Sequence, residues 1–245
     1  MFRRLVVVVV FLSSFVTAAS GEPPLPKPWR RSLFNQPPYE AGLDQAVLYE
    51  GRPSIFIRAE FPHLTEIGPG KFTAKFSAVS GVRQAIKADR YRGQRVRWSG
   101  YLHTNGAGSV WSDGFTGAHR SAASQSTSPG AGLYVVVDSR DGTVLYAMTR
   151  DRLIGENDWT KLEIVFDVAP QSALVTLGIF LAGKGELWAT GFGFEEVSPS
   201  LPTTSYLDLT GTQIYDYTFA RHKKRLKEYG RLPDAPVLQT RAENR

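Results

Sequence analysis

Residues 95–103 read RVRWSGYLH, and this stretch decides the fold class. Successive side chains of a β-strand point to opposite sides, so Val96, Trp98 and Leu102 fall on one face. The residues between them, Arg97 and Tyr101 included, fall on the other face. The pattern predicts a strand with one side against a hydrophobic core and the other side turned away from it.

Further short strands are expected along the chain at roughly regular spacing. After the first stretch they are residues 133–138, 162–168, 174–181 and 187–197, and before it 55–59, 72–79 and 84–93. No segment from 94 to 197 is periodic enough for a long helix. This cadence is typical of an antiparallel β-sandwich or barrel, so we expect an all-β fold. A short helix around residues 219–229 is expected in the tail.

The two ends of the chain differ in character from this β region. Residues 1–20 combine a basic start, an apolar run and small residues, as in a secretory signal peptide, and the apolar run is too short to span a bilayer. Residues 21–38 contain six prolines and are expected to form a linker. We therefore divide the chain into a signal peptide (1–20), a Pro-rich linker (21–38), a β-sandwich domain (39–198) and a basic tail (199–245).

Composition narrows the function classes further. The 245 residues include no cysteine, which excludes disulfides, thiol catalysis and cysteine-based zinc sites. The net charge of +6 is concentrated in the last 25 residues, where eight basic residues stand against three acidic ones. The β region is therefore close to neutral, and specific nucleic-acid binding is not expected. The tail, with its run Arg221 to Lys227, is a candidate for contact with an anionic surface.

Three segments carry a resemblance to a known family. They are YRGQRVRWSGY (91–101), GLYVVVD (132–138) with DRLIG (151–155) and DW (158–159), and LGIFLAGKGELW (177–188) after DVA (167–169). Together they resemble the galactose-binding-like jelly-roll domains, related to carbohydrate-binding modules, of bacterial exported and regulatory proteins. The resemblance covers roughly residues 39–197. It implies a jelly-roll β-sandwich, and it implies function only weakly because one fold hosts many unrelated sites.

A recognition site is expected on the sheet face opposite the core. If Leu133, Val135 and Val137 point inward, their neighbours on the same strand point outward. Binding a sugar requires an aromatic plate for the pyranose ring and fixed polar groups for its hydroxyls. The candidate ligand contacts are Arg97, Tyr101, His103, Tyr134 and Asp138. Core roles are expected instead for Trp98, Trp159 and Trp188.

No metal, cofactor or catalytic residue is predicted. Calcium sites of related modules use acidic residues just after the tryptophan, but Thr190 and Gly191 stand there, which leaves Asp44 or Glu40 near the first strand as the acidic candidates for another site. Val136 stands where the related domains carry a polar or basic residue, which weakens any transfer of their ligand contacts. The four histidines show no metal-ligand spacing, and no nucleophile elbow is present. The adjacent Glu195 and Glu196 point to opposite faces of a strand, which is wrong for paired acid–base chemistry.

We therefore expect an exported, non-catalytic module, secreted or periplasmic, that binds carbohydrate or another cell-envelope polymer. The alternatives are a structural or partner-binding envelope protein and, less favoured, a polysaccharide lyase or glycosidase. Residues 105–130 form a long irregular stretch whose role the sequence does not indicate.

Overall fold

The computed structural model describes residues 24–32, 39–59, 65–68, 71–73, 79–109, 130–142, 144–149, 151–204 and 225–238. Sheet A contains, in spatial order, β1 (Arg30–Arg31), β6 (Val79–Lys87), β11 (Ser172–Ala182), β8 (Gly130–Ser139) and β9 (Val144–Met148). Sheet B contains β10 (Gly155–Asp167), β7 (Arg95–Ser109), β12 (Lys184–Glu196), β3 (Arg52–Ala59) and β2 (Tyr39–Tyr49). A separate ribbon pairs β4 (Thr65–Gly68) with β5 (Lys71–Thr73).

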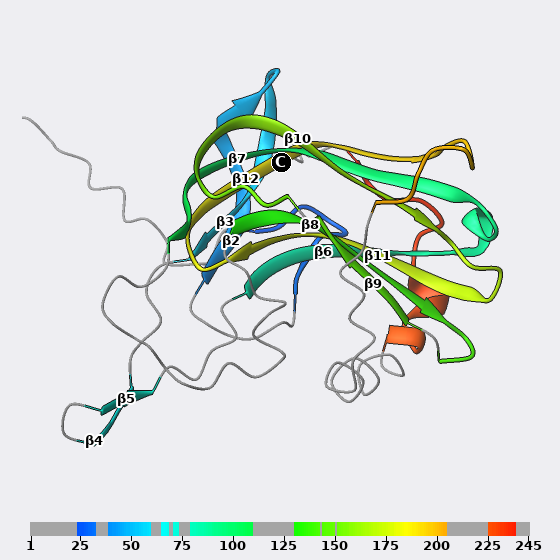
Figure 1. The fold of residues 1–245 in the computed structure, drawn as a ribbon, viewed down its shortest axis with the longest axis horizontal. Coiled ribbons are helices and arrows are strands. Elements are labelled where there is room, and N and C mark those ends of the chain that lie inside the picture. Colours follow the sequence, from blue (N-terminus) through cyan, green and yellow to red (C-terminus); the bar gives the residue numbers. More distant parts are fainter. Residues whose placement is uncertain are drawn as a thin grey trace, which may run out of the picture.

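The two five-stranded sheets are stacked face to face, and all of their strand pairs are antiparallel (Figure 1). The chain repeatedly crosses between them: β6, β8, β9 and β11 belong to sheet A, whereas β7, β10 and β12 belong to sheet B. The expected β-sandwich of jelly-roll type is therefore confirmed. No helix in the described part of the chain is long and apolar enough to cross a membrane.

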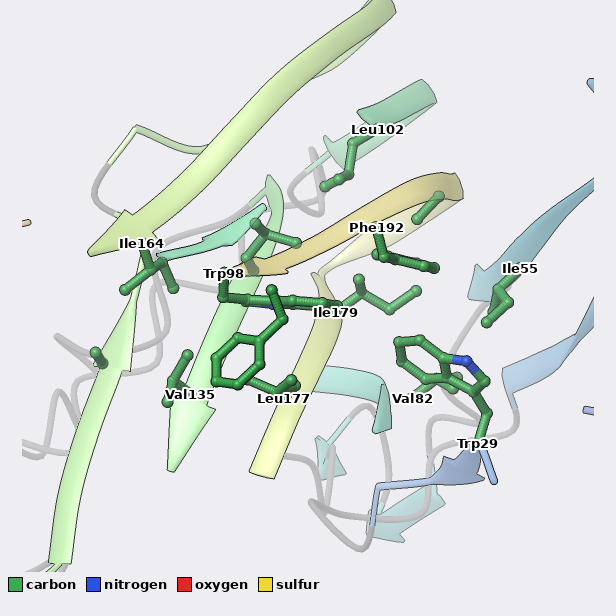
Figure 2. Packing of buried hydrophobic residues seen from close by; sticks show 14 of the residues in the cluster. Trp29, Ile55, Val82, Trp98, Leu102, Val135, Ile164, Leu177, Ile179 and Phe192 are labelled. Carbon is green, nitrogen blue, oxygen red and sulfur yellow. The ribbon is translucent and has the colours of Figure 1, made fainter. Parts of the chain in front are cut away.

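The core between the sheets is built from the inward residues of alternating strands (Figure 2). Val96, Trp98 and Leu102 are fully buried there, as their alternation predicts. The Trp98 ring stacks on Phe192 with centroids 5.2 Å apart, and its indole Nε1 donates to the backbone oxygen of Gly178, 3.4 Å away. This contact joins sheet B to sheet A through the centre of the molecule.

Most expected strands are present, and several are longer than their sequence pattern indicated. The stretch 95–103 extends to Ser109 as β7, and 84–93 divides into the end of β6 and the 3-10 helix η1 (Asp89–Tyr91). Only part of 72–79 is described, in β5 and at the start of β6. The strands β2 and β9 were not expected. Residues 110–129 of the irregular stretch, residues 1–20 and most of the expected helix at 219–229 lie outside the described residues.

Part of the expected linker belongs to the sandwich. Trp29 is 4% exposed, and its ring packs on Phe192 with centroids 4.8 Å apart. The next two residues form β1, which pairs with Val82 and Arg83 of β6. The prolines of this segment disfavour a helix or a central strand. They still permit a short edge strand and the burial of a neighbouring tryptophan. Residues 24–32 are therefore integrated into the fold.

Part of the basic tail is also docked on the sandwich. We call residues 225–238 the C-terminal strap; it contains the 3-10 helix η3 (Tyr229–Arg231). The Lys87 N–H donates to the Pro233 oxygen over 2.9 Å, and the Gln84 side-chain amide bonds both the N–H and the oxygen of Val237 at 3.0 Å. These bonds satisfy polar groups along β6 beyond the reach of β1, which protects a sheet edge.

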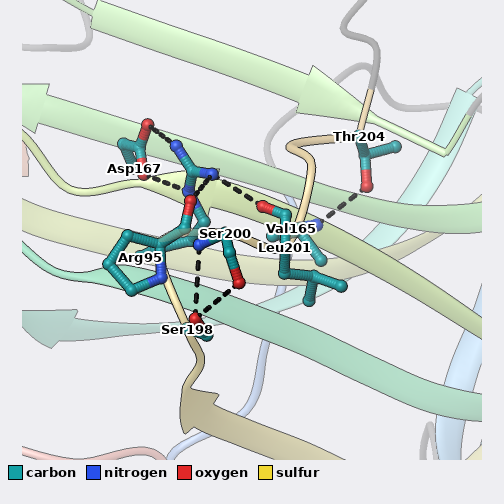
Figure 3. Close-up of polar contacts among 8 residues, drawn as sticks. Arg95, Val165, Asp167, Ser198, Ser200, Leu201 and Thr204 are labelled. Atoms are coloured by element: carbon teal, nitrogen blue, oxygen red, sulfur yellow. Dashed lines mark hydrogen bonds and ion pairs between the residues drawn. The ribbon is translucent and has the colours of Figure 1, made fainter.

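The opposite edge of the sandwich, along β10, is held by a polar clamp (Figure 3). The Arg95 guanidinium bonds both carboxylate oxygens of Asp167, at 2.7 and 2.8 Å, and donates to the backbone oxygens of Pro199 and Leu201 at 2.6 Å. Thr204 exchanges two hydrogen bonds with the backbone of Val165, both 2.9 Å long. Residues 199–204 therefore run beside the end of β10 and cover its free edge.

Candidate functional site

The outer face of sheet A is sealed by aromatic rings that lie flat on the sheet. Tyr134 of β8 faces Gly178 of β11, and Phe180 of β11 faces Gly132 of β8. A Cβ on Gly178 would lie 2.2 Å from the Tyr134 ring, and one on Gly132 would lie 2.9 Å from the Phe180 ring. Each ring therefore covers the glycine opposite it, an arrangement that suits cross-strand glycine–aromatic pairs. Both aromatic residues are only 1% exposed.

A buried ion pair closes the same face at one end. The Asp138 carboxylate, with no exposed surface, receives two bonds from Arg225 of the C-terminal strap, Nε to Oδ2 at 2.6 Å and Nη2 to Oδ1 at 2.5 Å. A bidentate guanidinium is the partner that a buried carboxylate requires, because an unpaired charge there would be very costly. The charge of Asp138 is thus neutralised inside the protein.

The expectation that Tyr134 and Asp138 face solvent is therefore wrong. Both residues do lie on the side of β8 opposite Leu133, Val135 and Val137, as the alternation predicts. They point outward but are not exposed. Tyr134 lies over a glycine, is stacked by Tyr146 and donates to the Ser32 hydroxyl over 3.3 Å, and Arg225 covers Asp138. Burial raises the pKa of Tyr134 to about 12, so its phenol stays protonated at neutral pH. Neither side chain is placed to contact a polymer.

The outer face of sheet B is different, because its aromatic side chains contact one another in a row, with one stacked pair and three tilted pairs. Ring centroids follow one another from Trp188 to His103 at 5.4 Å, His103 to Trp159 at 5.5 Å, Trp159 to Tyr49 at 5.2 Å and Tyr49 to Tyr101 at 4.4 Å. We call these five residues the aromatic row. All of its members except Trp188 are half-buried, so they retain ring surface for a ligand.

Hydrogen bonds hold the row in place at its Trp188 end. The Trp188 indole Nε1 donates to the Asp44 carboxylate over 2.9 Å, and His103 Nδ1 lies 2.7 Å from the backbone oxygen of Asn157. Burial raises the pKa of Asp44, but bonds from Trp188 and from two backbone N–H groups outweigh it, so the pKa lies below its ordinary value. Desolvation raises the pKa of Tyr49 to about 12. Hydrogen bonding and charge effects of Tyr101 and Glu50 raise this pKa as well.

Polar side chains of β3, β7 and β12 border the row. Arg58 Nε bonds Glu186 Oε1 at 2.5 Å, and the other oxygen of Glu186 accepts from the Asn105 side-chain amide at 3.1 Å. Arg58 also lies 3.6 Å from Glu40. Fixed donors and acceptors next to half-exposed rings are the combination that sugar hydroxyls and pyranose rings require.

The structure separates the five predicted site residues into two groups. Tyr101 and His103 belong to the aromatic row. Arg97 lies on the same face of β7, but Glu195 holds it at 2.7 and 3.0 Å and Glu163 lies 3.7 Å away. Since a strand rises about 3.3 Å per residue, its backbone lies about 13 Å from that of Tyr101. Tyr134 and Asp138 belong to the other sheet, so the five do not form one site.

Sequence reasoning missed three members of the row. Trp159, expected in the core, lies on the outer face, because it alternates with the inward Ile164 and Phe166 of the same strand, and a bulge between Asn157 and Thr160 lies beside it. Trp188 is buried, but it lies on the outer face rather than in the core cluster. Tyr49 comes from β2 at the far edge of sheet B, where the pairing of β2 with β3 is irregular between Asp44 and Leu48. Strand alternation was the signal that could have found both tryptophans, because Trp159 is out of phase with the inward Ile164 and Phe166, and Trp188 lies between the inward residues Leu187 and Ala189.

The described residues contain no group of three or more histidine and acidic side chains that could hold a metal ion. Thr190 Oγ1, at the position considered for calcium, donates to the backbone oxygen of Pro53 over 2.9 Å. Asp44 and Glu40, the other acidic residues considered, bond Trp188 and Arg58 respectively.

The chain matches no protein-family model. Among curated proteins it is similar to the uncharacterized HTH-type transcriptional regulator YbfP of Bacillus subtilis (strain 168). The two are 28% identical over 187 residues, which cover 76% of this chain and 52% of that protein. The chain thus spans about half the length of this curated relative.

Among solved structures, the chain is similar to the CBM22-1 xylan-binding domain from Paenibacillus barcinonensis Xyn10C. The TM-score is 0.43 at 16% identity, over 73% of this chain and 92% of that domain. It is also similar to TmCBM61 in complex with β-1,4-galactotriose, with a TM-score of 0.39 at 11% identity, over 70% of this chain and 90% of the other. Family 16 Carbohydrate Binding Module-2 gives a TM-score of 0.37 at 14% identity, over 65% of this chain and 86% of the module.

Proposed function

We propose that this protein is a non-catalytic recognition module that binds a carbohydrate or another cell-envelope polymer on the outer face of sheet B. The observation that carries the proposal is the aromatic row, five rings in successive contact on the outer face of sheet B, four of them half-buried. The apolar C–H face of a pyranose packs on such rings. Asn105, Glu186 and Arg58 lie beside the row to bond hydroxyl groups.

The shape of the site favours a polymer chain over a single small molecule. The rings are contributed by β2, β7, β10 and β12, so the row crosses sheet B rather than lining an enclosed pocket. A surface of this width contacts several units of a chain at once, and each stacked unit adds a modest share of the affinity.

A glycan array probed with the chain lacking residues 1–20 tests the proposal. We expect binding to a subset of polysaccharides, and loss of at least about tenfold in affinity for Trp159→Ala, equivalent to about 1.4 kcal/mol. Tyr229→Ala is the matched control, since this half-buried tyrosine lies on the C-terminal strap and contacts Arg140 and Asp89 instead of the row. Its affinity should equal that of the unmodified protein.

Two outcomes would redirect the proposal. An array without binding, together with a protein captured specifically in a pull-down, would favour a structural or partner-binding role. Release of reducing ends or unsaturated products from a polysaccharide panel would favour a glycosidase or lyase. Binding that persists unchanged in both Trp159→Ala and Tyr101→Ala would mean that the ligand binds elsewhere on the molecule.

We also propose that the protein is exported to the periplasm or beyond the cell, with residues 1–20 as a cleaved signal peptide. The support is the basic, apolar and small-residue order of this segment. Expression of the full chain in a bacterial host, followed by N-terminal sequencing, should give a product that begins at Ser20 or Gly21. A product that keeps Met1 in the cytoplasm would contradict export.

A further inference from the structure

The aromatic row lies in acidic surroundings although the protein as a whole is basic. The chain carries a net charge of +6. The carboxylates that border the row, by adjacency in sequence or by contact, are Glu40, Asp44, Glu50, Asp158 and Glu186. Asp44 bonds Trp188 directly, Glu50 follows Tyr49, and Asp158 precedes Trp159. The site and the molecule that carries it therefore differ in the sign of their charge.

The cations near the row are already engaged. Arg58 is paired with Glu186 at 2.5 Å and with Glu40 at 3.6 Å, and Arg52 lies 3.8 Å from Glu50. Lys161, the cross-strand neighbour of Tyr101, lies 3.8 Å from Glu163. An anionic ligand would have to compete with these carboxylates for each guanidinium or ammonium group.

The carboxylates, by contrast, are not all neutralised. Asp44 accepts hydrogen bonds from Trp188 and from the N–H groups of Ala46 and Val47. Its charged neighbour is Arg58, a single guanidinium that also pairs with Glu40 and Glu186, so one positive charge stands against three carboxylates. Asp158 is exposed, and within the described part of the chain its carboxylate enters no ion pair. Negative charge therefore remains on both the β2 side and the β10 side of the row. A field of one sign along a binding surface selects ligands of the opposite sign.

We infer that the aromatic row selects glycans by charge, binding chains of amino sugars most tightly, neutral chains less tightly and chains of uronic acids or sulfated sugars least. The inference rests on the proposed carbohydrate-binding function. The sugar rings stack on the row as before, and the ammonium groups of an amino-sugar chain lie within reach of Asp44 and Asp158. A carboxylate or sulfate at the same positions meets like charge, and the nearby cations Arg52, Arg58 and Lys161 are already paired with carboxylates.

The test compares glycans that share a backbone and differ only in charge. Each neutral glycan that binds on the array is measured by calorimetry beside its amino and uronate analogues. For a β-1,4-glucan the three are cellohexaose, the fully deacetylated chitosan hexamer and an oligoglucuronate. We expect at least about a tenfold affinity gap between amino and uronate chains at low salt, which shrinks near 1 M salt, where the Debye length falls to about 3 Å.

Charge-removing variants assign the effect to the row. The double variant Glu50→Gln with Asp158→Asn should narrow the gap between the amino and uronate chains. The control Asp234→Asn removes one carboxylate from the C-terminal strap, where it pairs with Lys87, and should leave the gap unchanged. A gap that is equal in all three proteins, or a uronate chain that binds most tightly, overturns the inference.

The two proposals fail in different ways. If some glycans bind and Trp159→Ala abolishes the binding, but charge has no influence on the ranking, only the inference is lost. If no glycan of any charge binds, the proposed function itself is wrong.

Discussion

The outer faces of the two sheets both carry aromatic and acidic residues, but these residues are buried on sheet A and mostly remain partly exposed on sheet B. On sheet A, Tyr134 and Phe180 lie flat over glycines, and Arg225 of the C-terminal strap neutralises Asp138. On sheet B, the rings of the aromatic row contact one another, and all except Trp188 are half-buried. An outward direction on a strand therefore does not predict a binding surface. Both faces have a tyrosine beside a glycine, since Tyr101 lies next to Gly191, so the further contacts of each ring decide whether it is sealed or partly exposed.

The largest expected effect is on sheet A, at the buried ion pair. Arg225→Ala leaves the Asp138 carboxylate without its cation in a site with no solvent, which should cost about 3–5 kcal/mol in the free energy of unfolding. Urea denaturation measures it. Adding Asp138→Asn to the same protein should recover part of the loss, because the buried charge is then removed. A loss below about 1 kcal/mol would mean that the face is not sealed by this pair.

A smaller loss of stability is expected for a mutation at Gly178, the glycine that the Tyr134 ring covers. Gly178→Ala places a Cβ 2.2 Å from the tyrosine ring and should destabilise the fold by about 1–3 kcal/mol, although alanine usually suits a strand at least as well as glycine. Gly230→Ala is the matched control, since no atom lies within 4 Å of its added Cβ. Thermal unfolding of both variants gives the comparison. Equal midpoints would show that the ring does not lie on Gly178.

On sheet B, we expect a mutation to cost less stability than the two sheet A variants and to weaken glycan binding. Tyr101→Ala removes one stacked pair with Tyr49, worth about 0.5–1.5 kcal/mol beyond the loss of its buried area. The same change should weaken binding to array-positive glycans about tenfold. Denaturation and calorimetry on one protein sample measure both quantities. If Tyr101→Ala lost as much stability as Arg225→Ala while glycan binding stayed unchanged, Tyr101 would be a structural residue and not part of a binding surface.

The smallest effect is expected at the polar clamp on the β10 edge. The bonds from Arg95 hold the pKa of Asp167 below its ordinary value, against a smaller raising effect of burial. Its contribution to stability is therefore present above the unfolded pKa of about 3.9 and is lost as the pH falls through the folded pKa. Asp167→Asn should be slightly less stable than the unmodified protein at pH 5–7, and the difference should vanish in more acidic buffer. A difference that is constant with pH would contradict this.

Much of the sandwich could be predicted, because the apolar runs and the alternation of apolar and polar residues in β7, β8, β11 and β12 are typical of strands. The alternation of Val96, Trp98 and Leu102 also gave the correct inner face. The strand β2 could not be found in this way, since its residues show no clear alternation and its place depends on pairing with β3. The site was predicted only in part. Tyr101 and His103 belong to it, and alternation along β10 would also have placed Trp159 on the outer face, whereas Tyr49 reaches it through the irregular pairing of β2 with β3.

Local patterns of residues were enough to establish an all-β chain, the inward residues of its main strands and a polar-aromatic outer side on β7. The reason is that strand geometry links neighbours in sequence, and alternation is a property of a few consecutive residues. Packing in three dimensions decided which outward residues remain accessible. That choice depends on glycines one strand away, on an arginine 87 residues further along the chain, and on a tyrosine from the far edge of sheet B.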